Sequence, residues 1–392
     1  MSSENIHIKP VFLKDLYQFA KHFAGSSNIE RIAPITISRA KAQTKNPYSQ
    51  PDDVVLFVAF KNNQVIGYIG RLPGLLSFEN KHYRVFWGST FYIMDKYRGK
   101  NIGKQLLDNM ISLNQDFVVT RVTPQADKVL KRYGMNLLGS LNYFQLRVEK
   151  VHCFKGLFEV YKKIDKTLCG KDQCGRELIN KVEECFYKLE KRFFYAAISG
   201  LVNKMAGNYK AWIANKIKES DFFEKQQLHR PFFYRGPELI NWMLQERWVF
   251  SQGDNKPELS GYHFSGIREL FTYITLKFYY KNHHHYTGFI ILCVSSHKGK
   301  TVLRVLDHLL KTTDVIPAAC ATVLKYARQY QADRVEFSDK MGQYLNRQII
   351  FKRFLKKQTR EYLYFPAHGN SPLERVKKDI RFDYCDGDTA FT

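Results

Sequence analysis

The segment 85–107, VFWGSTFYIMDKYRGKNIGKQLL, limits the fold of this chain more than any other stretch. An apolar run of β-branched and aromatic residues ends at Asp95, a glycine-containing turn spans 97–103, and a helical pattern begins directly after it. The first amides of a helix have no partner inside the helix and carry a partial positive charge, so this turn can bind a phosphate group. Lys100 and Lys104 add charge to it. The segment predicts an α/β fold with an anion-binding loop after a strand.

The same turn resembles the pyrophosphate loop of the GNAT superfamily of acyl-CoA-dependent N-acyltransferases. That family has Arg or Gln, two residues, Gly, one residue, and then Gly or Ala. Arg98 and Gly103 match the outer positions, and Asn101 replaces the middle glycine, which is a mild change because Asn tolerates a left-handed backbone. The resemblance implies acetyl-CoA or another acyl-CoA as cosubstrate. It would be bound by Phe91, Tyr92, Ile93, Arg98, Gly99, Lys100, Asn101, Ile102, Gly103 and Lys104.

The order of the predicted elements over residues 1–150 agrees with one GNAT domain, in which α and β elements share a mixed sheet. We expect a loop-rich segment over 26–53, because three prolines interrupt it. The other elements are a strand at 5–11, a helix at 14–23, a hairpin at 54–60 and 65–72, a helix at 102–113, a strand at 117–122, a helix at 124–132 and two short strands within 137–148.

A later motif of the family is only partly present. Ala126, Gly134 and Met135 keep its frame, but Thr123 replaces an asparagine and Leu130 replaces a tyrosine. In the family, that tyrosine often protonates the leaving CoA thiolate. Another group would then supply the proton, or the thiolate leaves unaided, and no general base is marked by its spacing. The candidate catalytic residues are Tyr133, Tyr143, Tyr92 and Asp95.

The rest of the chain predicts a basic helical connector over 151–230 and a second domain over 231–392. The apolar stretch 192–206 fits either a helix packed between domains or a helix on a membrane surface. The second domain is predicted to repeat the order of the first, but 308–316 contains neither glycine nor arginine, so we expect a degenerate GNAT-like domain without a cofactor loop. Its elements would be strands at 271–281, 286–296 and 301–308, a helix at 316–330, a strand at 334–338, a helix at 342–357 and a strand at 361–366.

The segment 234–249, YRGPELINWMLQERWV, resembles a signature at the start of the second half of bacterial tandem, or double, GNAT proteins. That likeness makes Arg235 and Trp242 candidate acceptor-binding residues. Taken alone, the pattern also fits an amphipathic helix whose tryptophans fill a core. The closing residues 383–388 contain three aspartates, which could face a pocket but fit a solvated tail better.

Charge and cysteine usage bear on location and partners. A formal net charge of +24 points to anionic surroundings such as a membrane surface or nucleic acid, or simply to a solvated basic surface. The chain opens without the apolar core of a signal peptide and has no apolar stretch long enough for a transmembrane segment. Seven scattered cysteines fit reduced thiols, and neither the Cys169–Cys174 spacing nor the histidines at 283–285 predict a metal site. We expect a cytoplasmic protein, or one that is peripheral at a membrane.

Three functions remain open from the sequence. The first is transfer of an acetyl or other acyl group from acyl-CoA to a small-molecule amine such as an amino sugar, by direct attack. The second is a Fem-like transferase that uses aminoacyl-tRNA, which the basic charge would suit. The third is a non-catalytic CoA-binding module. The loop at 98–104 favours the first, because a Fem-like protein does not need a pyrophosphate site.

Overall fold

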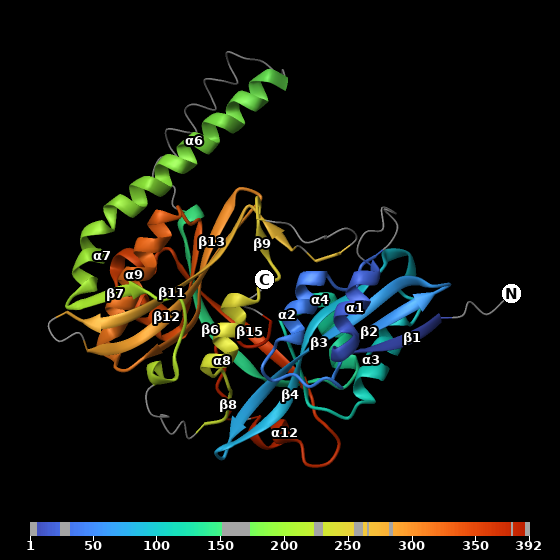
Figure 1. Cartoon of the computed structure of the whole chain (residues 1–392). Helices are drawn as coiled ribbons and strands as arrows, with labels where there is room; N and C mark the ends of the chain where they lie inside the picture. The colour runs from blue at the N-terminus through green and yellow to red at the C-terminus, as the bar shows by residue number, and fades with distance from the viewer. Residues whose placement is uncertain are drawn as a thin grey trace. The chain divides into compact units, whose positions relative to one another are not determined.

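The computed structural model describes residues 6–23, 32–150, 173–222, 230–254, 262–264, 266–281, 285–377 and 379–388. Cys169 and the histidines at 283 and 284 lie outside these ranges. The chain forms two compact units (Figure 1). Unit 1 contains Met1–Leu141, Asn215–Phe271 and Thr359–Thr392, and unit 2 contains Asn142–Ala214 and Thr272–Gln358. Each unit therefore draws on separated stretches of chain, and the division into 1–150, 151–230 and 231–392 stays a prediction about sequence domains.

Unit 1 is built on a mixed sheet with the strand order β1-β2-β3-β4-β5-β15. Neighbours from β1 to β4 are antiparallel, β5 is parallel to β4, and β15 is antiparallel to β5. The short β8 (Phe232–Phe233) pairs with β3. The strands are β1 (Ile6–Phe12), β2 (Val54–Lys61), β3 (Gln64–Phe78), β4 (Lys81–Ile93), β5 (Phe117–Thr120) and β15 (Leu355–Phe365, from Thr359 onward).

Helices cover both faces of this sheet, because alternate side chains of a strand point to opposite sides. On β2, Phe57 and Ala59 belong to one buried cluster together with α3 (Ile102–Ile111), whereas Val58 belongs to another with α1 (Leu13–Phe23). The remaining elements of unit 1 are α2 (Ile37–Thr44), η1 (Asp95–Tyr97), α4 (Pro124–Arg132), η3 (Glu219–Asp221), α8 (Pro237–Gln245), β9 (Phe250–Ser251), β10 (Ile267–Arg268) and α12 (Pro372–Val376).

The strands of unit 2 are both parallel and antiparallel and follow the order β6-β14-β13-β12-β11-β7. Its strands are β6 (Asn136–Arg147, from Asn142 onward), β7 (Tyr209–Ile213), β11 (Leu270–Tyr280), β12 (Tyr286–His297), β13 (Lys300–Leu310) and β14 (Arg334–Ser338). Its helices are η2 (Val148–Lys150), α6 (Gln173–Ala197), α7 (Ser199–Ala206), η4 (Thr313–Val315), α9 (Ile316–Gln329), α10 (Asp339–Asn346) and α11 (Ile349–Lys352). The predicted mixed α/β fold class is confirmed.

Several local predictions were wrong. The segment 26–53, expected as loop, contains α2, because the Thr36 side chain accepts a hydrogen bond from the Arg39 amide at 3.1 Å and caps the helix. Residues 137–148 form one strand rather than two. The segment 192–206 is interrupted at Ile198, between α6 and α7.

The basic segment 342–357 is also not one helix. The helix α10 ends at Asn346, α11 is a single turn, and β15 already begins at Leu355. The predicted strand at 361–366 is therefore the second half of a longer one. The last four residues of this strand, Tyr362 to Phe365, pair with β5. No helix of the described ranges is long and apolar enough to cross a membrane.

Candidate functional site

The loop between β4 and α3 has the backbone that an anion site requires. Gly99 and Asn101 both have positive φ angles, +81° and +64°. Asn101 precedes α3 without capping it through its side chain, and the first intrahelical bond runs from the Gln105 amide to the Asn101 carbonyl at 3.1 Å. The amides of the first helical residues therefore stand outside the helix's own hydrogen bonds. These residues are Ile102, Gly103 and Lys104.

Gly103 allows α3 to lie close against β4. A Cβ atom at this position would lie 2.9 Å from Ile93 Cδ1 and 3.3 Å from Phe91 Cζ. Arg98 lies at the exposed rim of the loop and forms an ion pair of 2.9 Å with Asp95. Both charged side chains are solvated, so this pair contributes little to stability and leaves Arg98 accessible to an anion.

A bulge interrupts β4 directly before the segment predicted to bind the cofactor. In the β3–β4 register, Arg71 pairs with Gly88 and Ile69 with Phe91, so Ser89 and Thr90 share the space opposite one residue. Such a bulge bends a strand and redirects its side chains. In the described part of the chain, β4 pairs with β5 only at Phe86–Trp87, although β4 continues to Ile93. The two parallel strands thus part at the bulge.

The two faces of β4 lead to different layers. Phe91 and Ile93 pack with the cluster of α3, whereas Tyr92 packs with the cluster of α1. A molecule held by the α3 loop and a second molecule on the α1 face could therefore meet where β4 leaves β5.

A polar chain lies on the bulge. One Nη of Arg39 donates to the Tyr262 hydroxyl at 2.9 Å, and the other donates to the Ser89 Oγ. Ser89 in turn donates to Asp388 Oδ2 at 3.1 Å. Burial of the Asp388 carboxyl raises its pKa, and the nearby Arg39 guanidinium opposes that shift. The arrangement places a carboxylate of raised basicity at the bulge of β4.

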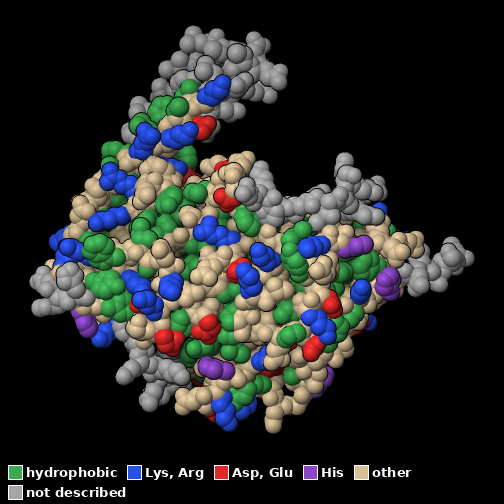
Figure 2. All heavy atoms as spheres, viewed as in Figure 1, with side chains coloured by type: hydrophobic (Ala, Val, Ile, Leu, Met, Phe, Trp, Pro, Cys, Tyr) green, Lys and Arg blue, Asp and Glu red, His purple; other side chains and the backbone are tan. Residues whose placement is uncertain are grey.

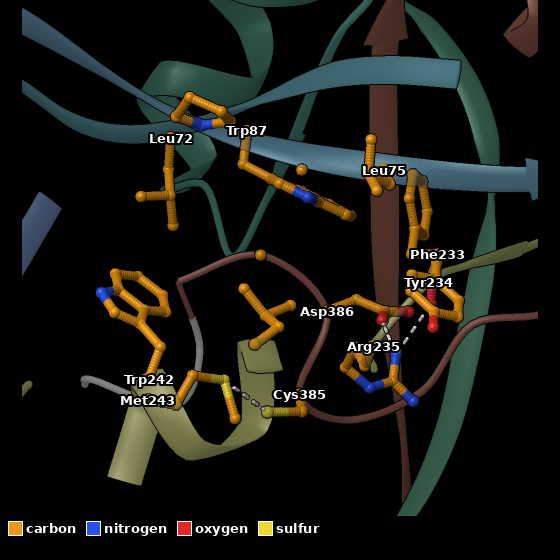
Figure 3. A pocket seen from close by; sticks show the side chains of 14 residues that line it. Leu72, Leu75, Trp87, Phe233, Tyr234, Arg235, Trp242, Met243, Cys385 and Asp386 are labelled. Atoms are coloured by element: carbon orange, nitrogen blue, oxygen red, sulfur yellow. Dashed lines mark hydrogen bonds and ion pairs between the residues drawn. The ribbon is translucent and has the colours of Figure 1, made fainter. Parts of the chain in front are cut away.

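The segment that carries this carboxylate is held in place along its length. Arg235 forms one ion pair with Asp386 (Figure 3) and a second, at 2.8 Å, with Asp383. Arg360 Nη1 donates to the Tyr384 carbonyl at 2.8 Å. The expectation of a solvated tail over 383–388 was wrong, because Asp386 is only 2% exposed.

The next residue of the segment lies where the strands part. A Cβ atom on Gly387, whose φ is +81°, would be 3.2 Å from Trp87 on β4 and 3.5 Å from Thr120, the last residue of β5. The chain end therefore packs beside the opening between β4 and β5, and Asp388 follows directly.

A small cavity lies beneath Trp87, between α8 and the segment 385–387 (Figure 3). Its volume of about 30 Å³ has room for a water molecule but not for a sugar or an acyl chain. Arg235 and Trp242, the predicted acceptor-binding residues, line it. Arg235 is engaged by the two aspartates, and Trp242 Nε1 donates to the Ala42 carbonyl at 2.7 Å. Both side chains thus have structural partners, and their role in acceptor binding stays a prediction.

The three candidate tyrosines lie in different places. Tyr133, at the end of α4, packs against the α3 cluster, and its buried hydroxyl has no hydrogen-bond partner among the described residues. Burial raises its pKa, and Asp108 adds to that shift. The Tyr92 ring lies tilted against the His263 ring, with centroids 4.0 Å apart, and burial and then Asp95 raise the pKa of Tyr92. Tyr143 belongs to unit 2, where it pairs with Ser338 on β14.

Sequence reasoning missed the polar chain at the bulge. Ser89 and Asp388 are 299 positions apart, and Arg39 lies in a segment that was expected to be loop. No local spacing connects such residues. The described residues contain no group of three His, Cys, Asp or Glu side chains that could hold a metal ion.

Comparison with known proteins relates the first part of the chain to a known protein family. The model of the acetyltransferase (GNAT) family matches residues 16–126. Among solved structures, the chain is similar to a GCN5-related N-acetyltransferase from Anabaena variabilis, with 11% identity and a TM-score of 0.44 over 92% of this chain and 72% of that one. It is also similar to a GCN5-related N-acetyltransferase from Kribbella flavida (9%, 0.46, covering 92% and 70%).

A third similar structure is Saccharomyces cerevisiae N-myristoyltransferase with bound myristoyl-CoA (10% identity, TM-score 0.47, covering 97% of this chain and 90% of that one). No curated protein matches the sequence. The family match spans the hairpin, β4, the loop between β4 and α3, and α3 in a single stretch. Residues 16–126 thus belong to the GNAT acetyltransferase family.

Proposed function

We propose that unit 1 transfers an acyl group from acyl-CoA to the amine of a small acceptor. One observation carries this proposal: an open anion-binding loop and a carboxylate of raised pKa meet at the same bulged strand, where β4 parts from β5. Direct transfer of an acyl group to an amine requires these two features. The cofactor must be held with its thioester at one place, and the amine must lose a proton there.

The residues present fit acyl-CoA. The amides of Ile102, Gly103 and Lys104 would hold the diphosphate, with Arg98 and Lys100 adding positive charge at the rim. The close approach of α3 to β4 at Gly103 brings those amides next to the strand. The amides of Phe91 to Ile93, beyond the last pair with β5, would then hold the pantetheine arm. Bound acyl-CoA supplies an activated acyl carbon and a thiolate leaving group.

Asp388 would accept the proton that the amine loses when the new N–C bond forms. Ser89 donates to Oδ2, and a carboxylate can accept further hydrogen bonds, so it can also receive one from the acceptor amine. Arg39 holds Ser89 from the other side, so the orientation of the carboxylate depends on α2. A carboxylate whose pKa is raised is a stronger base than one in water.

Tyr133 would supply the proton for the departing sulfur as the C–S bond breaks. It lies in the layer of α3, on the side of β4 where the anion-binding loop lies. Its buried hydroxyl makes no other hydrogen bond among the described residues, so a proton donor is available in that layer. A small amine such as an amino sugar is the proposed acceptor, because Tyr92 on the α1 face of β4 and His263 beside it present rings that can pack against a sugar or an alkyl amine.

Calorimetric titration with acetyl-CoA tests the cofactor site. We expect Gly103→Glu to abolish binding, because the added side chain meets Ile93 and Phe91 and brings a negative charge to the amides. Gly200→Glu is the matched control, since a Cβ atom at Gly200 meets nothing within 4 Å. Equal affinity of the two variants would refute the proposed site.

The same titrations separate the other two functions. Binding of tRNA that persists in Gly103→Glu, without binding of acetyl-CoA to the native protein, would favour the Fem-like transferase, to which the net charge of +24 gives some support. Binding of acetyl-CoA without transfer to any amine would favour a non-catalytic module.

A further inference from the structure

The strand β7 comes last in the strand order of unit 2, and its outer edge is open. Among the described strands, β7 pairs with β11 alone. Next to this pair, the Ala214 amide donates to the Thr275 carbonyl at 2.9 Å. Because hydrogen-bonded positions alternate in an antiparallel pair, Tyr209, Ala211 and Ile213 point their N–H and C=O groups away from β11. These groups have no backbone partner among the described residues, so β7 can accept a further strand.

Large apolar side chains are exposed at this edge. Trp212 and Ile213 are 57% and 70% exposed. Since neighbouring side chains of a strand point to opposite faces, each face of the edge carries one of them. In Figure 2, hydrophobic and basic side chains lie side by side in the region that Figure 1 labels β7. Edge strands are usually protected by prolines, by several charges or by a covering segment, but β7 reads YKAWI and has only Lys210 as a charge. This edge is therefore typical of one that pairs with another chain.

The sequence of β7 is complementary to itself when two copies run antiparallel. With Ala211 opposite Ala211 of the second copy, all three outward-facing residues form hydrogen-bonded pairs, which gives up to about six hydrogen bonds. On one face, Ile213 then lies opposite Tyr209 of the second copy. The Tyr209 ring is already held in place by Tyr280, with ring centroids 5.5 Å apart. On the other face, Trp212 lies opposite Lys210 of the second copy, and an ammonium group over an indole ring is a favourable contact.

Other alignments of the two strands are less favourable. A shift of two residues in one direction sets Lys210 opposite Lys210 of the second copy, and like charges in opposite positions destabilise a strand pair. A shift of two residues in the other direction leaves Tyr209 without an opposite residue in β7. The alignment centred on Ala211 is the one in which the whole strand takes part.

We propose that two copies of this chain form a symmetric dimer, in which the β7 strands pair antiparallel about a two-fold axis at Ala211. Such a contact uses the same edge of both copies, so it closes at two. An extended peptide of another protein could add to the same edge, but β7 itself supplies a matching residue at every position. Because a five-residue edge makes a small interface, we expect a dissociation constant in the micromolar range. The proposal does not depend on the chemistry of unit 1.

Sedimentation velocity of the full chain at rising concentration tests the proposal. We expect the native protein to pass from monomer to dimer between about 1 and 200 µM, without larger species. Trp212→Lys and Trp212→Glu remove the same exposed side chain and introduce opposite charges. The lysine would stand opposite Lys210 of the second copy and repel it, whereas the glutamate would form an ion pair with it. Trp212→Glu should therefore dimerise at least about tenfold more tightly than Trp212→Lys.

The backbone contact is tested by Ala211→Pro. The amide that proline removes points away from β11, so an edge strand tolerates the change, but the pair at the centre of the dimer loses its hydrogen bonds. The dissociation constant should rise at least about tenfold. The control is Ile349→Ser, Ile350→Ser on α11, which removes side chains that are 89% and 43% exposed and should dimerise like the native protein. Circular dichroism checks that each variant is folded.

Three results would overturn the proposal. The first is a native protein that stays monomeric over the whole concentration range or forms larger species. The second is equal dimerisation of Trp212→Lys and Trp212→Glu, because position 212 would then not face Lys210 of a second copy. The third is a folded Ala211→Pro variant that dimerises like the native protein, since the interface would then lie elsewhere.

Discussion

Replacement of Asp388 by Asn is the most direct test of the proposed chemistry. The change keeps an oxygen that can accept the hydrogen bond from Ser89, 3.1 Å away, and removes only the ability to take a proton. A positioned general base contributes about 10²- to 10⁴-fold to a rate, which is roughly 3–5 kcal/mol of activation free energy. We expect kcat for acyl transfer to fall by that factor while the affinity for acetyl-CoA is unchanged, because Asp388 lies on the α1 face and the anion-binding loop on the α3 side.

The raised pKa of Asp388 fixes the direction in which kcat and the free energy of unfolding should change with pH. Burial raises the pKa of Asp388, so its basic form is present only above that raised pKa, and native kcat should fall as the pH drops through it. Asp388→Asn should lack this acidic limb. A raised pKa in the folded state also means that ionised Asp388 costs stability at neutral pH, and this cost is absent below the pKa of the unfolded chain. We therefore expect the free energy of unfolding of Asp388→Asn at pH 7 to equal or exceed that of the native protein.

The matched control is Asp386→Asn, two positions earlier in the same segment. Asp386 is 2% exposed and pairs with Arg235, so its neutral substitute should lower the free energy of unfolding but keep the acidic limb of the pH profile. Initial rates of acyl transfer with acetyl-CoA and a panel of primary amines, measured between about pH 5 and pH 9, supply the pH profiles of the two variants. The reasoning is refuted if Asp388→Asn retains native kcat and its acidic limb.

Two further changes test the residues around this base. Tyr133→Phe should lower kcat for acyl transfer by about 10²-fold or more and remove the alkaline limb of the pH profile. The free energy of unfolding should hardly change, because the lost hydroxyl has no partner among the described residues. A native kcat in this variant would mean that the thiolate leaves unaided. Arg235→Met should cost about 3–5 kcal/mol of unfolding free energy in a urea titration, since the guanidinium faces two carboxylates and its side chain is only 12% exposed. A loss below about 1 kcal/mol would show that the segment is held mainly by other contacts.

Some features of the fold were predictable because their causes are local. The apolar run of β4, the turn and the start of α3 at Ile102 follow from residues that are neighbours in the sequence. Asn101 does adopt the left-handed backbone that its position in the motif requires, with a φ of +64°. The wrong predictions arose where long-range pairing decides, as in β15, which begins at Leu355 in a basic stretch and pairs through Tyr362 to Phe365 with β5, more than 240 positions earlier in the chain.

The sequence by itself determined the turn before α3 and the family match of residues 16–126, and it predicts an anion site there, because a phosphate site of this kind is made from consecutive backbone amides. Only the tertiary structure decided which side chains stand at the bulge of β4. Arg39, Ser89 and Asp388 come from a helix, a strand and the end of the chain, and they meet because Arg235 and Arg360 hold the last segment. A proton acceptor needs one atom in one place, and no spacing along the sequence records a contact across 299 residues.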